Sequence, residues 1–169
     1  MTGPTIRAAY STWPHYNAQL RDTVARLTDD QLAVQPSRER WPMWATIGHL
    51  ACQRVFWLCD AAGEPGADTT PSTDAGHNCP GDDDLEHVLG PAQLADALDS
   101  TFRVVEDRLD SWTIDMLGEE IRHPEWGPNW GYTRGSILQR VFAHDVYHSA
   151  ELNEMLGRSG LAEMRLWDW

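Results

Sequence analysis

The stretch Ala143-His144-Asp145-Val146-Tyr147-His148-Ser149-Ala150-Glu151 decides how the rest of the chain is interpreted. Its two histidines stand at positions i and i+4, so on a helix they lie on one face, about 6 Å apart along the axis. That spacing lets both imidazoles bind one metal ion at roughly 2.0–2.1 Å. The same periodicity continues on both sides and predicts a helix from an N-cap at Thr133 to a stop at Gly157. Its buried stripe contains both histidines, together with Ile137, Val141, Leu152 and Met155.

Three further long helices are predicted from the spacing of apolar residues. They run from Thr12–Pro14 to Leu27, from about Met43 to Ala62, and from Gly90-Pro91 to Trp112. A short capped turn at Thr28–Gln31 and a short helix at Leu85–Leu89, capped by the acidic run Asp82–Asp84, are also expected. Four long helices without a convincing strand predict an all-α four-helix bundle, a single domain over residues 1–169 with long connecting loops.

The two longest connectors differ in composition. Residues 63–84 lack periodicity and are rich in Gly, Pro, Thr and Asp, which predicts a flexible loop that serves as a lid or an insert. The connector 113–132 contains Pro and Gly residues that exclude a helix. The acidic run from Asp82 is interpreted as a solvated capping segment.

Composition excludes several classes of partner. A net charge of −13 argues against a nucleic-acid-binding protein, and there is no basic amphipathic run for an anionic membrane surface or any apolar stretch of bilayer length. The N-terminus lacks the apolar core of a secretory signal. The three cysteines, Cys52, Cys59 and Cys79, form no CxxC pair, so we expect no disulfide and a cytoplasmic location. Cys52 and Cys59 are interpreted as inert, and His77-Asn78-Cys79 as incidental.

A third histidine completes a candidate metal site. His144 and His148 alone are equally consistent with hydrogen-bonded core histidines. His49, however, also lies among core residues of a strong helix, with Gln53 one turn further along. Facing helices of a bundle are where metal sites are built, and three imidazoles with open positions describe a catalytic site. Zinc or nickel is the favoured ion, with iron as an alternative.

Two other motifs share parts of this pattern. His144-Asp145-Val146-Tyr147-His148 is similar to the HExxH of zinc proteases with Asp in place of Glu, but the sheet expected beside that helix is not predicted. His144-Asp145 is also similar to the His-Asp dyad of helical phosphohydrolases, whose further His and later Asp have no counterpart at suitable spacings.

The order and spacing of these parts resemble the DinB/YfiT-like superfamily of four-helix-bundle metalloproteins over nearly the full chain. The resemblance is carried by the late H-x-x-x-H and by the entry to the second helix, Trp41-Pro42-Met43-Trp44-Ala45-Thr46-Ile47-Gly48-His49-Leu50. It implies that the metal ligands are His49, His144 and His148. Many members follow the last histidine with Arg-Gly-Gln, whereas Ser149-Ala150-Glu151 stands here.

The resemblance also implies a function: a metal-dependent S-transferase or thiol-dependent isomerase that uses mycothiol, bacillithiol or glutathione on a small-molecule substrate, as a homodimer. Glu151 is then a fourth ligand, a base or an acceptor behind a ligand, and Gln53 assists in proton transfer or orientation. Two alternatives stay open: a non-catalytic metal- or ligand-binding stress-response protein, and a metal hydrolase with Glu151 as base. Candidate cofactor-binding residues are Trp130, Tyr132 and Arg134; Arg54 and Arg140 are further candidate carboxylate clamps, and Trp126 a further wall residue.

Overall fold

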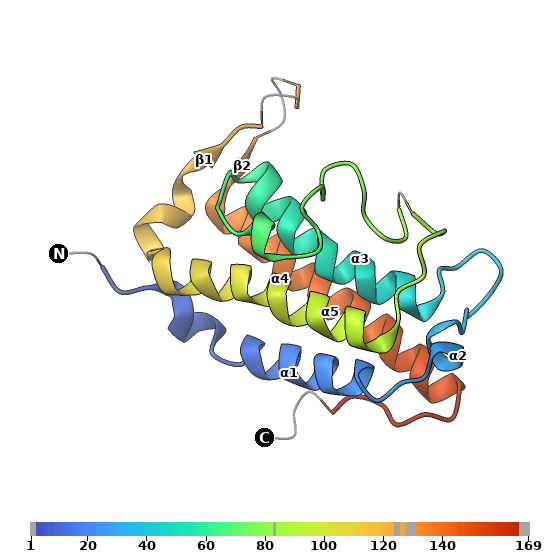
Figure 1. The fold of residues 1–169 in the computed structure, drawn as a ribbon. Helices are drawn as coiled ribbons and strands as arrows, with labels where there is room; N and C mark the ends of the chain where they lie inside the picture. Colours follow the sequence, from blue (N-terminus) through green and yellow to red (C-terminus); the bar gives the residue numbers. More distant parts are fainter. Residues whose placement is uncertain (1–2, 83, 124–125, 128–130, 166–169) are drawn as a thin grey trace.

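Four long helices form the bundle in the computed structural model, which describes residues 3–82, 84–123, 126–127 and 131–165 (Figure 1). They are α1 (Trp13–Val24), α3 (Met43–Val55), α4 (Pro91–Ser111) and α5 (Arg134–Arg158). Helix α3 packs against both α4 and α5, and α1 packs against α4. The predicted all-α four-helix bundle is therefore confirmed.

Local sequence signals account for where the helices begin. Prolines occupy the first turns of α1 and α4, where a missing backbone N–H costs nothing. The short helix α2 (Asp29–Leu32) starts with a capping box in which Thr28 accepts from the backbone N–H of Gln31. Thr133 caps α5 in the same way, because its side chain accepts from the backbone N–H of Ser136.

Helices α3 and α4 run in the same direction, which explains the long connector between them (Figure 1). The first half of α4 shares one hydrophobic cluster with α3, and its second half shares another with the π-helical turns, η2 (Phe56–Ala61), that continue α3. A chain that ends one helix must therefore travel back along the bundle before it begins the next. The connector 62–90 makes this return with only a short 3-10 turn, η3 (Ala67–Thr69), in the part of it that the structure describes.

The core of the bundle contains two large hydrophobic clusters with a polar layer between them, and a third, small cluster lies around Cys52 and Cys79. One cluster lies around Leu50, Leu98 and Leu152, and the other around Leu58, Val105 and Val141. Arg54 of α3 and Asp145 of α5 lie between these two sets of positions along their helices and are 1% and 6% exposed. The two helices that carry the candidate metal ligands are thus joined by a buried ion pair.

The helix predicted from about Met43 to Ala62 is helical over nearly that length: α3 ends at Val55 and continues as π-helical turns, η2 (Phe56–Ala61). The short helix predicted at Leu85–Leu89 is wrong. No helix forms at 85–89: Asp84 accepts from the backbone N–H groups of Glu86 and His87, and Leu85 and Val88 are exposed, so no apolar face is available for packing.

The remaining elements flank the bundle. Two-residue strands β1 (Glu120–Ile121) and β2 (Tyr132–Thr133), which the sequence did not suggest, pair antiparallel. 3-10 turns occur at η1 (Ile6–Tyr10) and η4 (Ile114–Gly118). Among the helices described, none combines the length and apolar character needed to cross a bilayer.

Candidate metal centre

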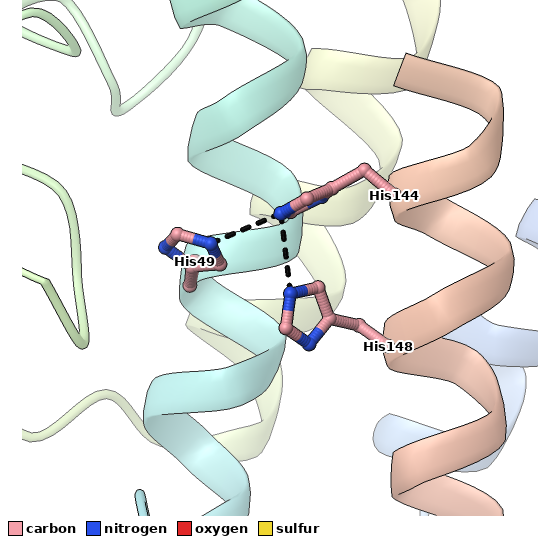
Figure 2. Close-up of side chains that lie close together, drawn as sticks. All are labelled: His49, His144 and His148. Atoms are coloured by element: carbon pink, nitrogen blue, oxygen red, sulfur yellow. Dashed lines mark hydrogen bonds between the residues drawn. The ribbon is translucent and has the colours of Figure 1, made fainter. Parts of the chain in front are cut away.

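The three predicted histidines meet between α3 and α5 (Figure 2). Nε2 of His144 lies 3.0 Å from Nε2 of His49 and 3.1 Å from Nε2 of His148. Two nitrogens that each bind a tetrahedral ion at 2.0–2.1 Å are about 3.3 Å apart, so the observed separations suit one shared ion after a small adjustment. His49 and His148 are buried, and His144 is partly buried.

Carboxylates behind two of the rings favour one tautomer. Oε2 of Glu151 lies 3.0 Å from Nδ1 of His148, and Oδ2 of Asp82 lies 3.1 Å from Nδ1 of His49. The Glu151 contact is a hydrogen bond, and because a carboxylate only accepts, it favours a proton on Nδ1 of His148 and a bare lone pair on its Nε2. The Asp82 carboxylate lies within ion-pair distance of Nδ1 of His49, and its charge favours a proton there. Lone pairs that face one another repel unless a cation lies between them. With its Nε2 also unprotonated, His144 completes a donor set that fits one metal ion.

Electrostatics also keep His144 in the form that binds metal. Burial, followed by the neighbouring rings of His148 and His49, lowers the pKa of His144 to about 3. At neutral pH its imidazole is uncharged, which is the state in which histidine is a metal ligand.

Glu151 is placed behind a ligand rather than among the ligands. Its oxygen contacts the ring nitrogen of His148 that points away from the cluster of Nε2 atoms. Of the roles that the sequence left open, this geometry favours the acceptor that orients a ligand. The contact arises within α5, since residues three apart are neighbours on a helix.

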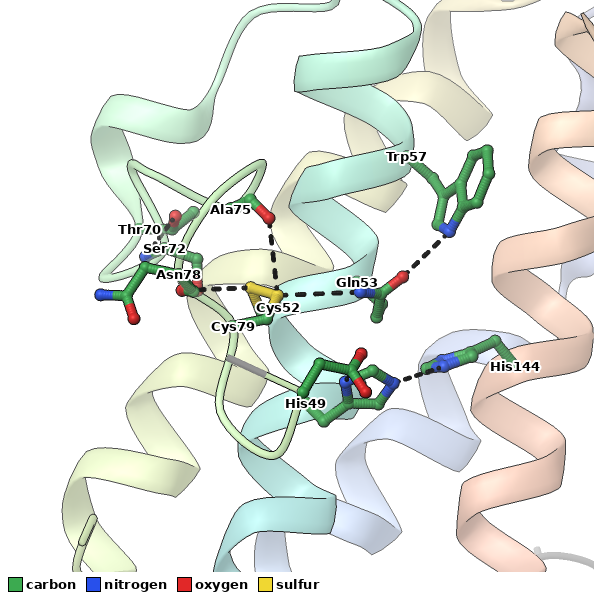
Figure 3. The surroundings of a disulfide bond; sticks show 11 residues. His49, Cys52, Gln53, Trp57, Thr70, Ser72, Ala75, Asn78, Cys79 and His144 are labelled. Atoms are coloured by element: carbon green, nitrogen blue, oxygen red, sulfur yellow. Dashed lines mark hydrogen bonds and ion pairs between the residues drawn. A yellow bond between two sulfur atoms is a disulfide. The ribbon is translucent and has the colours of Figure 1, made fainter. Parts of the chain in front are cut away.

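The environment of His49 contains a disulfide that the sequence analysis did not predict. Cys52 of α3 is bonded to Cys79 of the 62–90 connector, and both are buried (Figure 3). The expectation of no disulfide is therefore wrong, and Cys79 is not incidental. An odd number of cysteines excludes only full pairing, and Cys59 is the one left free. Burial raises the pKa of the Cys59 thiol to about 11, so it is a poor nucleophile.

We call residues 79–82 the clasp, because they lie across α3 beside His49. Pro80 packs on Gly48, where an added Cβ would come within 2.8 Å of the proline ring. Gly81 has φ +90° and lies against the ring of Trp41, which in turn is 4.8 Å from the His49 ring. Asp82 thus reaches His49 from a tethered segment. Its side chain is about half exposed, and Asp84 accepts backbone N–H groups as a capping residue does, so the run is solvated as expected but also borders the metal centre.

Arg54 is not a clamp for a ligand. Its guanidinium donates to Asp145, at 2.8 Å for the shortest contact, and to the backbone carbonyl of Leu98. Asp145 also accepts from Nε1 of Trp13, at 2.8 Å. The Asp of the H-D-x-x-H motif therefore anchors α5 to α3 and α1, and Arg54 has no free donor face toward the solvent.

The other predicted site residues lie along the seam between α3 and α5 or at its end. Gln53 accepts from Nε1 of Trp57 at 3.0 Å and contacts Sγ of Cys79 at 3.7 Å (Figure 3). Tyr132 packs edge-on against Trp57. Arg134 is paired with Glu64 and Glu119.

The aromatic wall that the sequence suggested is thus seen in part. Trp126 lies 5.8 Å from Trp57, between ring centroids, and Trp130 is outside the described residues. The described contacts of Gln53 and Tyr132 are with Trp57 rather than with the three histidines.

Comparisons with known proteins agree with this architecture. The family model of the DinB superfamily matches residues 17–152. A DinB-like protein from Bacillus cereus aligns with a TM-score of 0.67 and 14% identity, over 95% of this chain and 97% of that one. A conserved protein from Enterococcus faecalis aligns with a TM-score of 0.67 and 16% identity, over 90% and 96% of the two chains. A search of curated proteins found no match.

Proposed function

The chain belongs to the DinB superfamily, and on that premise we propose that it is a divalent-metal-dependent enzyme that uses a low-molecular-weight thiol as nucleophile. The observation that supports this proposal is the convergence of three Nε2 atoms on one point. Three protein ligands leave coordination positions open, as in catalytic rather than structural sites. An ion held there supplies one property, the stabilisation of a sulfur as thiolate at neutral pH.

The protein's own residues prepare the site for this chemistry. Glu151 accepts a hydrogen bond from Nδ1 of His148, and Asp82 lies within ion-pair distance of Nδ1 of His49, so both carboxylates help to orient the rings before a ligand arrives. In a transfer the sulfur forms a new bond to an electrophilic carbon, and the leaving group departs with the electrons of the broken bond. The proton of the thiol passes to the solvent. Gln53 acts through Trp57, which it orients.

A hydrolase that uses Glu151 as base has weaker support. A base must reach a nucleophile at the open side of the site. The described contact of Glu151 is instead with Nδ1 of His148. A non-catalytic metal- or ligand-binding protein is the alternative that the same experiment separates.

Zinc or nickel is the ion that we propose, with iron as alternative, because neutral imidazoles suit all three. The homodimer and the cytoplasmic location stay predictions. The location was inferred from unpaired cysteines, and the Cys52–Cys79 disulfide removes that argument.

The test is to load the full chain with cobalt or nickel and titrate it with glutathione, mycothiol and bacillithiol. We expect a metal–thiolate absorption band with at least one of them, and no band with the variant His144→Ala. The thiol that gives the band should then be consumed in the presence of a model electrophile. A wild-type protein that binds metal but gives no band with any thiol would favour the non-catalytic alternative.

A further inference from the structure

The structure separates the three arginines that the sequence offered as anion clamps. Arg54 is buried and paired with Asp145, and Arg134 is paired with Glu64 and Glu119. Arg140 is exposed, and within the described part of the chain no carboxylate lies within ion-pair distance of it. Its guanidinium carbon instead lies 4.2 Å from the ring centroid of Trp57. Of the three, Arg140 alone is not already paired with a carboxylate in the described part of the chain.

Arg140 lies on the same helix face as the metal ligands. It precedes His144 by four residues on α5, so it is one turn away along the face that carries both histidines. On the facing side, Gln53 follows His49 by one turn and holds Trp57 through its indole N–H (Figure 3). The metal centre and the Arg140–Trp57 stack therefore lie along one seam between α3 and α5.

Trp57 fixes the position of the arginine. The indole belongs to the π-helical turns η2, is hydrogen-bonded to Gln53 and packs against Trp126 and Tyr132. An arginine stacked on such a ring keeps its in-plane N–H donors free for a planar oxyanion. A preorganised cation loses less conformational entropy on binding than a free surface arginine does.

A groove elsewhere on α5 contains arginines but offers no comparable cation. This groove, of about 580 Å³, borders Glu151 on α5 and is lined by Arg40 and Arg158 among others. Arg40 lies 3.9 Å from Glu151, and Arg158 lies 2.6 Å from Glu154. Each positive charge in the groove already faces a glutamate, so an anion would have to compete with it.

We propose that Arg140 binds an anionic group of the thiol, and that this group, a carboxylate, lies one to two helical turns from the sulfur, about 6–12 Å. This inference rests on the proposed function, since the sulfur must sit at the metal centre. A carboxylate matches the fork of donors on a guanidinium, and charge-assisted hydrogen bonds are the strong ones. The thiol class expected is therefore an extended mercapto-acid rather than a neutral or cationic thiol.

The test compares two thiols that differ only in their ends, mercaptohexanoate and mercaptohexanol. Each is titrated into the cobalt-loaded full chain, and the dissociation constant is read from the metal–thiolate band. Wild-type protein should bind the acid about tenfold more tightly than the alcohol, which is the lower end of the gain for one hydrogen bond to a charged group. Arg140→Gln should abolish this preference and leave the affinity for the alcohol unchanged, and Arg140→Lys should restore part of it.

Arg103→Gln is the matched control, because Arg103 is an exposed arginine on α4. It should keep the full preference of the wild type. The alcohol is the internal check that Arg140→Gln still folds and still presents its metal. Equal affinities for the two thiols in wild type, or the same preference in Arg140→Gln, would overturn the role of Arg140. No band with either thiol would overturn the thiolate proposal itself, and this inference with it.

Discussion

The two sides of the metal centre hold their histidines by different means. On the α5 side, Glu151 reaches His148 from the next turn of the same helix. On the α3 side, Asp82 reaches His49 from the connector 62–90, which a disulfide attaches to α3 at Cys52. The first contact depends only on helix formation. The second depends on a long chain return, a covalent link and a close fit of the clasp. A carboxylate behind a metal ligand can thus come from the same helix or from a remote segment. Only the remote carboxylate can move away from its histidine while the helix stays folded.

The largest effect is expected where the two sides are joined. Asp145→Asn leaves the buried guanidinium of Arg54 without its counter-charge, and breaking such a pair costs about 3–5 kcal/mol. Urea unfolding of the metal-free protein measures this loss of free energy. Asp99→Asn, which breaks a surface pair with Arg21, is the control and should cost less than about 1 kcal/mol. Equal losses in the two variants would contradict the role of the buried pair.

The next effect concerns the tether of the α3 side. The double variant Cys52→Ser and Cys79→Ser should lose about 2–4 kcal/mol of unfolding free energy, because the open connector gains conformational freedom in the unfolded chain. It should also bind zinc more weakly, as measured by competition with a chelating dye, since the clasp then holds Asp82 less firmly. Cys59→Ser leaves the disulfide intact and should bind zinc as the wild type does. An unchanged zinc affinity in the double variant would show that the clasp does not act on His49.

Combined variants separate the contributions of the two sides to zinc affinity. Asp82→Asn and Glu151→Gln should each weaken zinc binding about 10- to 100-fold, the usual cost of removing a partner behind a ligand. In the background without the disulfide, Asp82→Asn should have a smaller effect, whereas Glu151→Gln should keep its full effect. Two effects that both persist in that background would mean that the clasp holds its position without its covalent link.

The smallest effect is on the pH dependence of stability. Burial lowers the pKa of His144 to about 3 in the folded chain, against an ordinary value of 6.5. Between these values the unfolded chain binds a proton that the folded chain does not, so stability falls as the pH falls from 6.5 toward 3. In the metal-free protein, His144→Gln should show a shallower fall between pH 7 and pH 5. We expect a difference of about 1 kcal/mol after allowance for solvent screening. Parallel pH curves in urea unfolding would contradict the buried neutral state.

Local patterns predicted most of the bundle and the three histidines. The starts of α1, α4 and α5 follow from proline and threonine at fixed helical positions. His144 and His148 follow from a spacing of one turn, and His49 from its place in an apolar helix. These features depend on neighbours within a turn, which a single sequence displays directly.

The features that were missed depend on contacts between remote segments. Nothing near Cys79 shows that it faces Cys52, because that pairing depends on the parallel course of α3 and α4 and on the return of the connector. Asp82 was ambiguous for the same reason. Arg54 and Arg140 are both arginines on predicted helices and were both candidate clamps, yet Arg54 is buried against Asp145 and Arg140 is exposed over Trp57. A rule that a buried arginine needs a carboxylate could have suggested a partner for Arg54, but the sequence does not show its burial.

We propose that His49, His144 and His148 hold one divalent ion. The most direct measurement is elemental analysis of the full chain after loading with zinc and removal of free metal, for wild type, His144→Ala and His148→Ala. His87→Ala, which removes an exposed histidine of the connector, is the control. We expect about one ion per chain in wild type and control, and a loss of nearly all metal in both cluster variants. Undiminished metal in His144→Ala and His148→Ala would contradict it.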